Sequence, residues 1–280
     1  MGITFSFSMT SLLHAYDVEF SDNGDQGQGW CLGAPAGIAP AQWPRSRVNG
    51  LPMAHVFTVL VPSEYRTKGE DLVAVALFQA DDHVADVVGG VYDTIEMQEL
   101  SEEADESEPF WASLLEYATG RHPQELYLED LIDGGWAVVW LTETEFRGPA
   151  AVPPAQAVGV FPDYNSSDGT SAYAPQNDRQ YMSLVVRVAD PNVGKMPKEF
   201  PSEAAGEYVP MYSEKGQELG LEKLFWGKAH FGGTSSPCQG EPNTSPFYLE
   251  FDETFGGANL GGDGVAFIDL LNDRLNWACG

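Results

Sequence analysis

Alternating apolar and polar residues near the C-terminus constrain the fold more than any other feature of the sequence. Phe247, Leu249 and Phe251 alternate with polar residues, which is the period-two pattern of a β-strand with one buried face. Val265 and Phe267 repeat this pattern after a loop rich in glycine, a residue that accepts positive φ angles at little cost. We therefore expect two strands here, joined by a glycine-rich loop.

The same alternation predicts further strands upstream. They are expected over residues 55–62, 71–79, 136–141 and 181–190, with one or two more within residues 1–20. Residues 21–52 lie between the strands expected within residues 1–20 and the strand expected over residues 55–62. This long segment is rich in Gly, Pro, Asn and Gln. We expect this segment to be a loop that Trp30 and Trp43 anchor to the core.

Helical spacing of apolar residues is confined to a short region. Apolar residues between 110 and 118 recur at intervals of three and four, with Ser107 placed as an N-cap and Gly120 at the C-terminal end. Pro123 is expected to open a second short helix that extends to about residue 131. The chain is therefore predicted to have few helices, and short ones.

A weak internal repeat suggests how these elements are organised. Aligning Phe57 with Phe247 places Val59, Val61, Val75 and Leu77 on Leu249, Phe251, Val265 and Phe267. Period-two strands also align by chance, so a duplication and a chance match both remain open. We expect an α+β fold with two similar lobes of mixed or antiparallel sheet, residues 1–150 and 151–280, with one compact domain as the alternative.

Charge is the strongest compositional signal. The 280 residues include 42 acidic and 14 basic residues, a formal net charge of −28. Such a chain repels phosphates, which argues against nucleic acid and anionic membranes as partners. Residues 91–150, read as an acidic insertion in the first lobe, hold fifteen of the acidic residues and only two basic ones, Arg121 and Arg147. This concentration is typical of a docking surface for a basic protein, but solubility or salt adaptation would also produce an acidic chain.

The acidic insertion supplies the candidate binding residues. The carboxylates expected to attract a basic partner are Glu99, Glu102, Glu103, Asp105, Glu106 and Glu108. An aromatic side chain next to them, Trp111 or Trp136, would supply apolar contact at the centre of the interface. Core packing of its helix is the alternative role for Trp111.

No pattern in the sequence supports catalysis, a metal or a cofactor. The five histidines are isolated in the sequence, and no nucleophile, phosphate-loop or dinucleotide motif is present. Two acidic groups were weighed as metal ligands and interpreted as solvated loops: Asp81, Asp82, His83 and Asp86, and Asp163, Asn165 and Asp168. Glu250, Asp252 and Asp269 are expected on the outward, polar side of their strands rather than as a carboxylate pair. The chain is therefore not expected to be an enzyme.

Cysteine usage and hydropathy indicate a compartment. Cys31, Cys238 and Cys279 are few and widely spaced, which suits a reducing environment. The sequence contains neither a signal peptide pattern nor an apolar run long enough to cross a membrane. We therefore expect a cytoplasmic protein.

The C-terminal segment resembles the YwqG-like family of bacterial proteins. The residues that carry the resemblance are a turn at Gly232 and Gly233 with Pro237 and Gln239 after it, the strand over residues 245–252, the loop residues Gly262, Asp263 and Gly264, and the closing strand over residues 265–270. Residues 49–65 fit the corresponding segment of the first lobe more loosely. Two features depart from the family pattern: Thr234 and Ser235 stand where an aromatic residue or proline is expected, and the chain ends directly after the second strand.

The resemblance implies a duplicated α+β protein without catalytic residues that acts as an immunity protein in a polymorphic toxin or type VI secretion system. Such a protein would bind a cognate toxin, of which a basic nuclease is the class best suited to an acidic surface. The alternative from another class is a small-molecule-binding protein or enzyme that uses a cleft between the two lobes.

Overall fold

The computed structural model describes residues 13–21, 27–80, 87–130, 132, 134–155, 172–173, 179–201 and 207–279. The strands of this part of the chain are β1 (Tyr16–Phe20), β2 (Gly29–Cys31), β3 (Ala54–Leu60), β4 (Leu72–Gln79), β5 (Glu125–Glu129), β6 (Gly135–Thr142), β7 (Gln180–Val186), β8 (His230–Phe231), β9 (Tyr248–Asp252), β10 (Val265–Asp269) and β11 (Arg274–Ala278). They form one sheet in the order β11-β10-β9-β8-β1-β7-β2-β3-β4-β6-β5. Every neighbouring pair is antiparallel.

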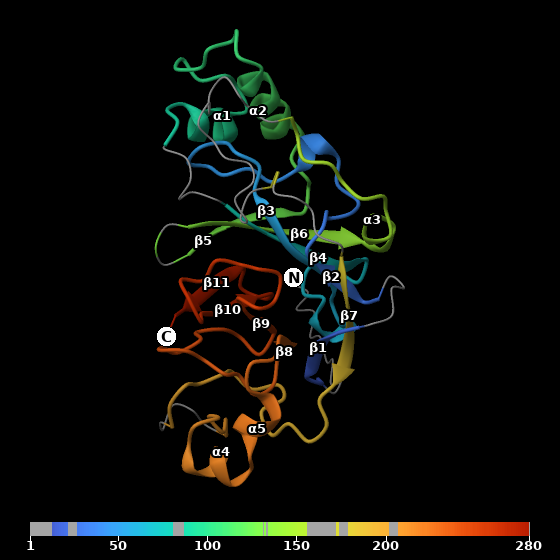
Figure 1. Cartoon of the computed structure of the whole chain (residues 1–280), viewed down its shortest axis with the longest axis vertical. Helices are drawn as coiled ribbons and strands as arrows, with labels where there is room; N and C mark the ends of the chain where they lie inside the picture. The colour runs from blue at the N-terminus through green and yellow to red at the C-terminus, as the bar shows by residue number, and fades with distance from the viewer. Residues whose placement is uncertain are drawn as a thin grey trace, which may run out of the picture.

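The sheet curves until its two edge strands, β5 and β11, lie beside each other, which gives a nearly closed barrel (Figure 1). A hydrogen bond spans the two edges: the indole Nε1 of Trp277 in β11 donates to Oδ2 of Asp130, the residue after β5, at 2.7 Å. The indole of Trp136 in β6 donates to the same oxygen at 2.9 Å. Asp130 therefore ties the two ends of the sheet together.

The inside of the barrel is one apolar core. Side chains from both halves of the chain pack in it, among them Phe57, Val75, Leu128, Trp140, Met182, Phe231, Leu249, Phe251, Ile268 and Leu275. Burial of this kind contributes roughly 25 cal/mol for each Å² of apolar surface removed from water. Because the sheet and the core run through both halves, the broad prediction of antiparallel sheet with few helices is confirmed, whereas two separate lobes are not.

The strand order has a regularity of its own. On one side of the central pair β1–β7 the strands run β8, β9, β10, β11, and on the other side β2, β3, β4, β6. Two consecutive residues with positive φ follow both β2 and β8: Leu32 and Gly33, then Gly232 and Gly233. In this register Phe57 corresponds to Leu249, not to Phe247, because Cys31 pairs with Phe57 and Phe231 pairs with Leu249. A duplication stays a prediction.

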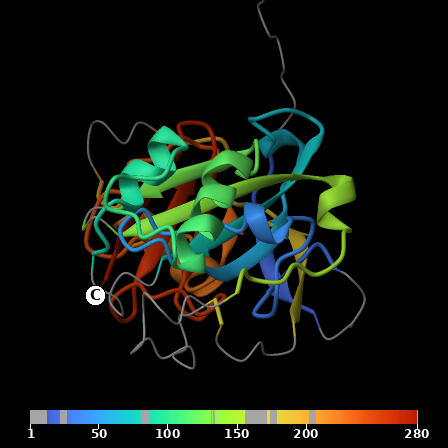
Figure 2. The same ribbon diagram turned by 90° about the horizontal axis from the view of Figure 1, so that it is seen from above.

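The helices are short, as expected, and lie outside the barrel. They are α1 (Val91–Met97), α2 (Pro109–Gly120), α3 (Glu143–Phe146), α4 (Glu214–Glu218) and α5 (Leu221–Phe225), with 3-10 turns η1 (Pro40–Gln42) and η2 (Ser63–Tyr65). The predicted helix over residues 110–118 is α2, which ends at Gly120 and takes Glu108 rather than Ser107 as its N-cap. Seen from above, α1 and α2 lie in front of the strands, while α4 and α5 lie at the other end of the molecule (Figures 1 and 2).

The second predicted helix, after Pro123, is wrong. Residues Glu125–Glu129 form strand β5, which pairs with β6. Alternation places Leu126 and Leu128 on the apolar interior of the barrel, and this tertiary contact outweighs the weak local preference for helix.

The other predicted strands are confirmed in β3, β4, β6, β7, β9 and β10. The short strands β2 and β8 were not predicted, and the chain continues after β10 into a further strand, β11. Trp30 lies in β2, within the segment predicted as a loop, and Trp43 lies in the loop between β2 and β3; both are anchored as expected, buried in a second apolar cluster on the outer face of β4 and β6. Residues 1–12, where one strand was expected, lie outside the described residues.

Candidate functional site

Helices α1 and α2 form a small cluster that carries the predicted acidic residues. Val91, Ile95, Phe110, Leu114 and Tyr117 pack between the two helices. The guanidinium of Arg45 holds α2 against the loop after η1 by donating to Ser113 Oγ at 2.6 Å. This packing presents the connection between the helices, residues 98–108, at the surface of the molecule.

The predicted carboxylates are accessible. Glu99, Glu102, Glu103, Asp105 and Glu106 are exposed, and Glu108 is half-buried. The amide and hydroxyl of Ser107 donate to Asp105 and hold the pKa of that carboxyl below its usual value. Among the described residues, none of the six carboxylates forms an ion pair, and the nearby pair Arg47–Glu96, at 3.1 Å, involves a different acid. The connection therefore presents uncompensated negative charge.

The aromatic side chains predicted beside this charge are not on the surface. Trp111 is 4% exposed and packs within the α1–α2 cluster, and Trp136 is buried inside the barrel. Trp111 therefore has the core-packing role that was its alternative. The large apolar side chains that α1 does expose are Tyr92, at 55%, and Met97, at 71%.

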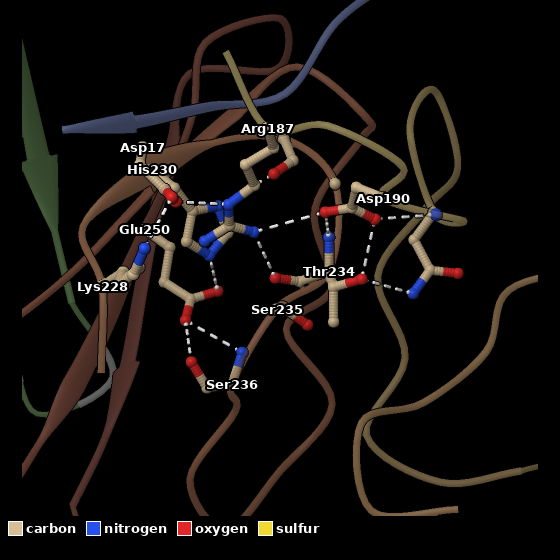
Figure 3. A network of polar contacts seen from close by, with 12 residues as sticks. Asp17, Arg187, Asp190, Lys228, His230, Thr234, Ser235, Ser236 and Glu250 are labelled. Carbon is tan, nitrogen blue, oxygen red and sulfur yellow. Dashed lines mark hydrogen bonds and ion pairs between the residues drawn. The ribbon is translucent and has the colours of Figure 1, made fainter. Parts of the chain in front are cut away.

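A second feature, which the sequence did not reveal, is a buried network of charged side chains on the outer side of β1, β8 and β9 (Figure 3). The guanidinium of Arg187 lies at its centre, paired with Asp17 and, at 3.4 Å, with Asp190. It also donates to the carbonyl of Thr234 at 2.9 Å and lies over the ring of Phe225. Its Nη2 has no hydrogen-bond partner among the described residues.

His230 and Glu250 form the other part of this network. The carbonyl oxygen of Gly232 lies 2.8 Å from Nδ1 of His230, and because a carbonyl only accepts, Nδ1 carries a hydrogen. Nε2 of the same ring lies 3.1 Å from Oε2 of Glu250. Oε1 of Glu250 accepts from the amide and hydroxyl of Ser236 at 2.9 and 2.8 Å.

Two further buried carboxylates accept hydrogen bonds from hydroxyl-bearing residues. Asp190 accepts from the amide and the hydroxyl of Thr234, each at 2.8 Å, and Asp269 accepts from the amide and the hydroxyl of Ser245, each at 2.7 Å. The Thr234 hydroxyl, directly after Gly232 and Gly233, is thus one of several donors to the buried Asp190, a contact that proline would not make.

Glu250 and Asp269 lie on the outer side of their strands, as expected, but they are buried there and not solvated. They are 2% and 1% exposed, because the segments that follow β7 and β8 cover this face of β9 and β10. They do not form a carboxylate pair, since Glu250 lies opposite Phe267, and Asp269 lies opposite Tyr248. Asp252, in contrast, is half-buried.

The corresponding face on the other side of the barrel is apolar. In the regular strand order described above, His230 and Glu250 of β8 and β9 correspond to Trp30 and Thr58 of β2 and β3. Trp30 packs there in an apolar cluster. The charged network is therefore not a requirement of the sheet itself.

A cavity of about 490 Å³ adjoins the network. Its lining includes Tyr212, Trp226, Lys228, Ser236, Glu250 and Asp263. Lys228 Nζ lies 2.9 Å from Asp17 Oδ2, which connects the cavity wall to the centre of the network.

Three other histidines of the described residues, His14, His55 and His122, also have partners, and most of these partners lie far away in the sequence. His122 is buried 3.2 Å from Glu145, and His14 lies 3.2 Å from Glu64. His55 contacts the carbonyl of Gly33 and the hydroxyl of Thr58, each at 2.9 Å, and burial lowers its pKa to about 4. These histidines are therefore isolated along the sequence but have partners in the folded structure.

The two acidic loops weighed as metal ligands, at residues 81–86 and 163–168, lie outside the described residues. Within the part of the chain that the structure describes, His, Cys, Asp and Glu do not gather in threes at metal-binding geometry. Nor does any helix of that part have both the length and the apolar character needed to cross a bilayer.

Comparisons with family models, with curated proteins and with solved structures each find no match to this chain. The resemblance to the YwqG-like family therefore stays a prediction that rests on the residues given above.

Proposed function

We propose that this protein binds a basic protein partner through the acidic connection between α1 and α2, and that it is a cytoplasmic immunity protein that neutralises a cognate toxin. The observation that carries the binding proposal is the set of exposed carboxylates in residues 99–106, which form no ion pair with any described residue. The toxin assignment follows from the resemblance to the YwqG-like family. A nuclease fits best, because an enzyme that holds phosphates presents a basic face.

Electrostatics gives this surface two effects on binding. Uncompensated charge of one sign raises the rate at which an oppositely charged partner arrives, by a factor of roughly 10 to 10³ at low salt. Charge pairs that lose their water in the complex contribute coupling energies of about 1.5–7 kcal/mol each. Tyr92 and Met97, exposed on the adjoining helix, supply the apolar contact that charge alone does not.

The test is a charge reversal with a matched control. The partner is first isolated from host lysate by pull-down at low and high salt and identified by mass spectrometry. Its association rate is then measured with the unaltered protein, with Glu102→Lys/Glu103→Lys/Glu106→Lys, and with Glu214→Lys/Glu218→Lys/Glu222→Lys. The control reverses the same number of exposed acids on α4 and α5, at the other end of the molecule.

We expect the first variant to associate at least tenfold more slowly at low salt, with a smaller difference at 0.5 M salt, and the control to change the rate far less. Equal rates for the two variants would remove the α1–α2 connection as the docking surface. Recovery of the protein without any stoichiometric basic partner would remove the immunity proposal itself.

The buried network favours a second candidate function, binding of a small molecule. The cavity of about 490 Å³ beside Glu250 has the size of common ligand pockets, and Arg187 keeps one unused donor nearby. Native mass spectrometry of the purified protein tests this candidate. A bound mass that is lost in Glu250→Gln, but kept in Glu116→Gln, which alters an exposed acid of α2 outside this cavity, would support binding beside the network, and a ligand-free spectrum would count against it.

A further inference from the structure

The two edge strands of the barrel cannot pair with each other in the way that all other strands do. Eleven strands with only antiparallel neighbours leave β5 and β11 pointing in the same direction. One additional strand, running opposite to both, would complete a barrel of antiparallel pairs. We use the term seam for the space between β5 and β11.

The backbone of β5 faces the seam at Glu129. Trp140 N donates to Gln124 O and Asp130 N donates to Gly134 O, so the even-numbered residues of this strand bond to β6. Because backbone groups alternate along a strand, the N–H and C=O of Glu129 point away from β6. The side chain of Glu129 is exposed.

The backbone of β11 faces the seam at Leu275 and Trp277. Leu270 N donates to Phe247 O, so the even-numbered positions along β10 bond to β9 and the odd-numbered ones to β11. Asn276 lies opposite Phe267 and therefore bonds to β10, which leaves Leu275 and Trp277 directed outward.

A cavity lies along the seam. Its volume is about 590 Å³, and residues 127–129 of β5, residues 273–278 in and before β11 and the loop 238–244 line it. Thr244 and Asn276 in this lining are largely shielded from solvent, and the Oγ1 of Thr244 and the Oδ1 of Asn276 have no hydrogen-bond partner among the described residues. Buried polar atoms without partners are rare in native proteins, and a ligand that brings hydrogen-bonding groups would satisfy them.

The chemistry of the two faces specifies the occupant. On the inner side, Leu126, Leu128, Leu275 and Trp277 belong to or pack against the apolar core, so the inward side chains of an added strand must be apolar. On the outer side, the cavity lining contains three acids, of which Glu241 pairs with Lys198 and Asp273 with Lys68. Glu129 forms no ion pair among the described residues, so an outward side chain of an added strand next to Glu129 is favoured if it is basic.

We propose that the seam is a strand-addition site, which takes an extended peptide of a partner protein with alternating apolar and basic residues, antiparallel to β5 and β11. Backbone hydrogen bonds to Glu129, Leu275 and Trp277 supply affinity, and the alternation supplies specificity. The bond from Trp277 Nε1 to Asp130 spans one end of the seam and opens when the peptide enters. The site is separate from the α1–α2 connection, so it does not depend on the toxin assignment.

The test uses a fluorescein-labelled peptide of seven residues in which valine and lysine alternate, with binding measured by fluorescence anisotropy on the full chain. Glu129→Pro removes the outward N–H, and proline is tolerated on an edge strand where the N–H does not serve the sheet. Glu129→Thr is the matched control, because it removes the same charge and keeps the N–H. Trp277→Phe removes the bond across the seam and keeps an aromatic ring in the core.

We expect Glu129→Pro to weaken binding at least tenfold relative to Glu129→Thr, and Trp277→Phe to strengthen it. A peptide methylated at alternate backbone nitrogens, and one with glutamate in place of lysine, are expected to bind at least tenfold more weakly. Equal binding by Glu129→Pro and Glu129→Thr, or by the methylated and unmethylated peptides, overturns the proposal.

Hydrogen exchange of the unaltered protein provides a readout that does not depend on any variant folding. The amides of Glu129 and Trp277 are expected to exchange quickly in the free protein and at least tenfold more slowly with peptide. Slow exchange of these amides before peptide is added would mean that this chain fills the seam itself, and would overturn the proposal.

Discussion

Glu125 is the first residue of β5, and its carboxyl group is largely buried next to Tyr117 of α2. The hydroxyl of Tyr117 donates to its Oε1 at 2.5 Å, while Oε2 has no hydrogen-bond partner among the described residues. Burial raises the pKa of Glu125 to about 7, against the opposing effect of the Tyr117 hydrogen bond. Glu125, which connects α2 to the barrel through Tyr117, therefore titrates near neutral pH.

The sign of this effect gives a prediction for stability. A carboxyl group with a raised pKa stabilises the folded state below its unfolded pKa of 4.5, and this contribution is lost as the pH rises through 7. We expect Glu125→Gln to gain stability relative to the unaltered protein between pH 5 and pH 8, by about 2 kcal/mol. Urea unfolding across this pH range measures the difference.

Glu129→Gln, on the exposed side of the same strand, is the control and is expected to leave the pH dependence of unfolding unchanged. A difference between Glu125→Gln and the unaltered protein that does not vary with pH would show that burial does not raise the pKa of Glu125.

At the scale of the elements, buried charges join β1 to the segment that follows β7. Arg187 has two acidic partners, Asp17 and Asp190, and all three side chains are buried. Lys228 also contacts Asp17, but its side chain is partly exposed. Asp17 thus has a buried partner, Arg187, and a partly exposed partner, Lys228. The contributions of the two pairs to the stability of the fold can therefore be compared.

We expect Arg187→Met to destabilise the fold by about 3–5 kcal/mol, because it leaves Asp190 buried without a cation and Asp17 with only the partly exposed Lys228. Lys228→Met removes the exposed partner of the same Asp17 and is expected to cost less than about 1 kcal/mol. Chemical denaturation of both variants provides the comparison. Similar losses for the two would indicate that solvent reaches Asp17 in the folded state.

The sequence predicts the long strands because their alternation is a local signal. It does not reveal β8, which has two residues, or the pair His230–Glu250, whose members lie on different strands and meet only through the register of β8 with β9. The acidic surface was predictable from charge alone. The burial of Trp111 was not, since an apolar face on a short helix contacts either its own core or a partner, and only the position of α1 decides between them.

At the scale of the whole molecule, the net charge of −28 opposes compaction by self-repulsion. Screening weakens this repulsion over about 10 Å at 0.1 M salt. We expect the unfolding temperature to rise between 10 mM and 0.5 M sodium chloride, with the fold retained at the lower concentration. Calorimetry at both concentrations measures this, and loss of the fold at 10 mM would favour salt adaptation over partner binding as the reason for the acidity.

Strand β1 has a consequence for how the protein is made. It precedes the other described strands in the sequence, yet both of its neighbours in the sheet, β7 and β8, come from the second half of these 280 residues. Lys228 and its partner Asp17 are 211 residues apart. Pairings across such separations form slowly, because the entropy of closing the loop is lost before any contact compensates for it. Synthesis must therefore pass residue 231 before β1 acquires both neighbours, and until then the growing chain depends on chaperones or on its own negative charge to avoid aggregation.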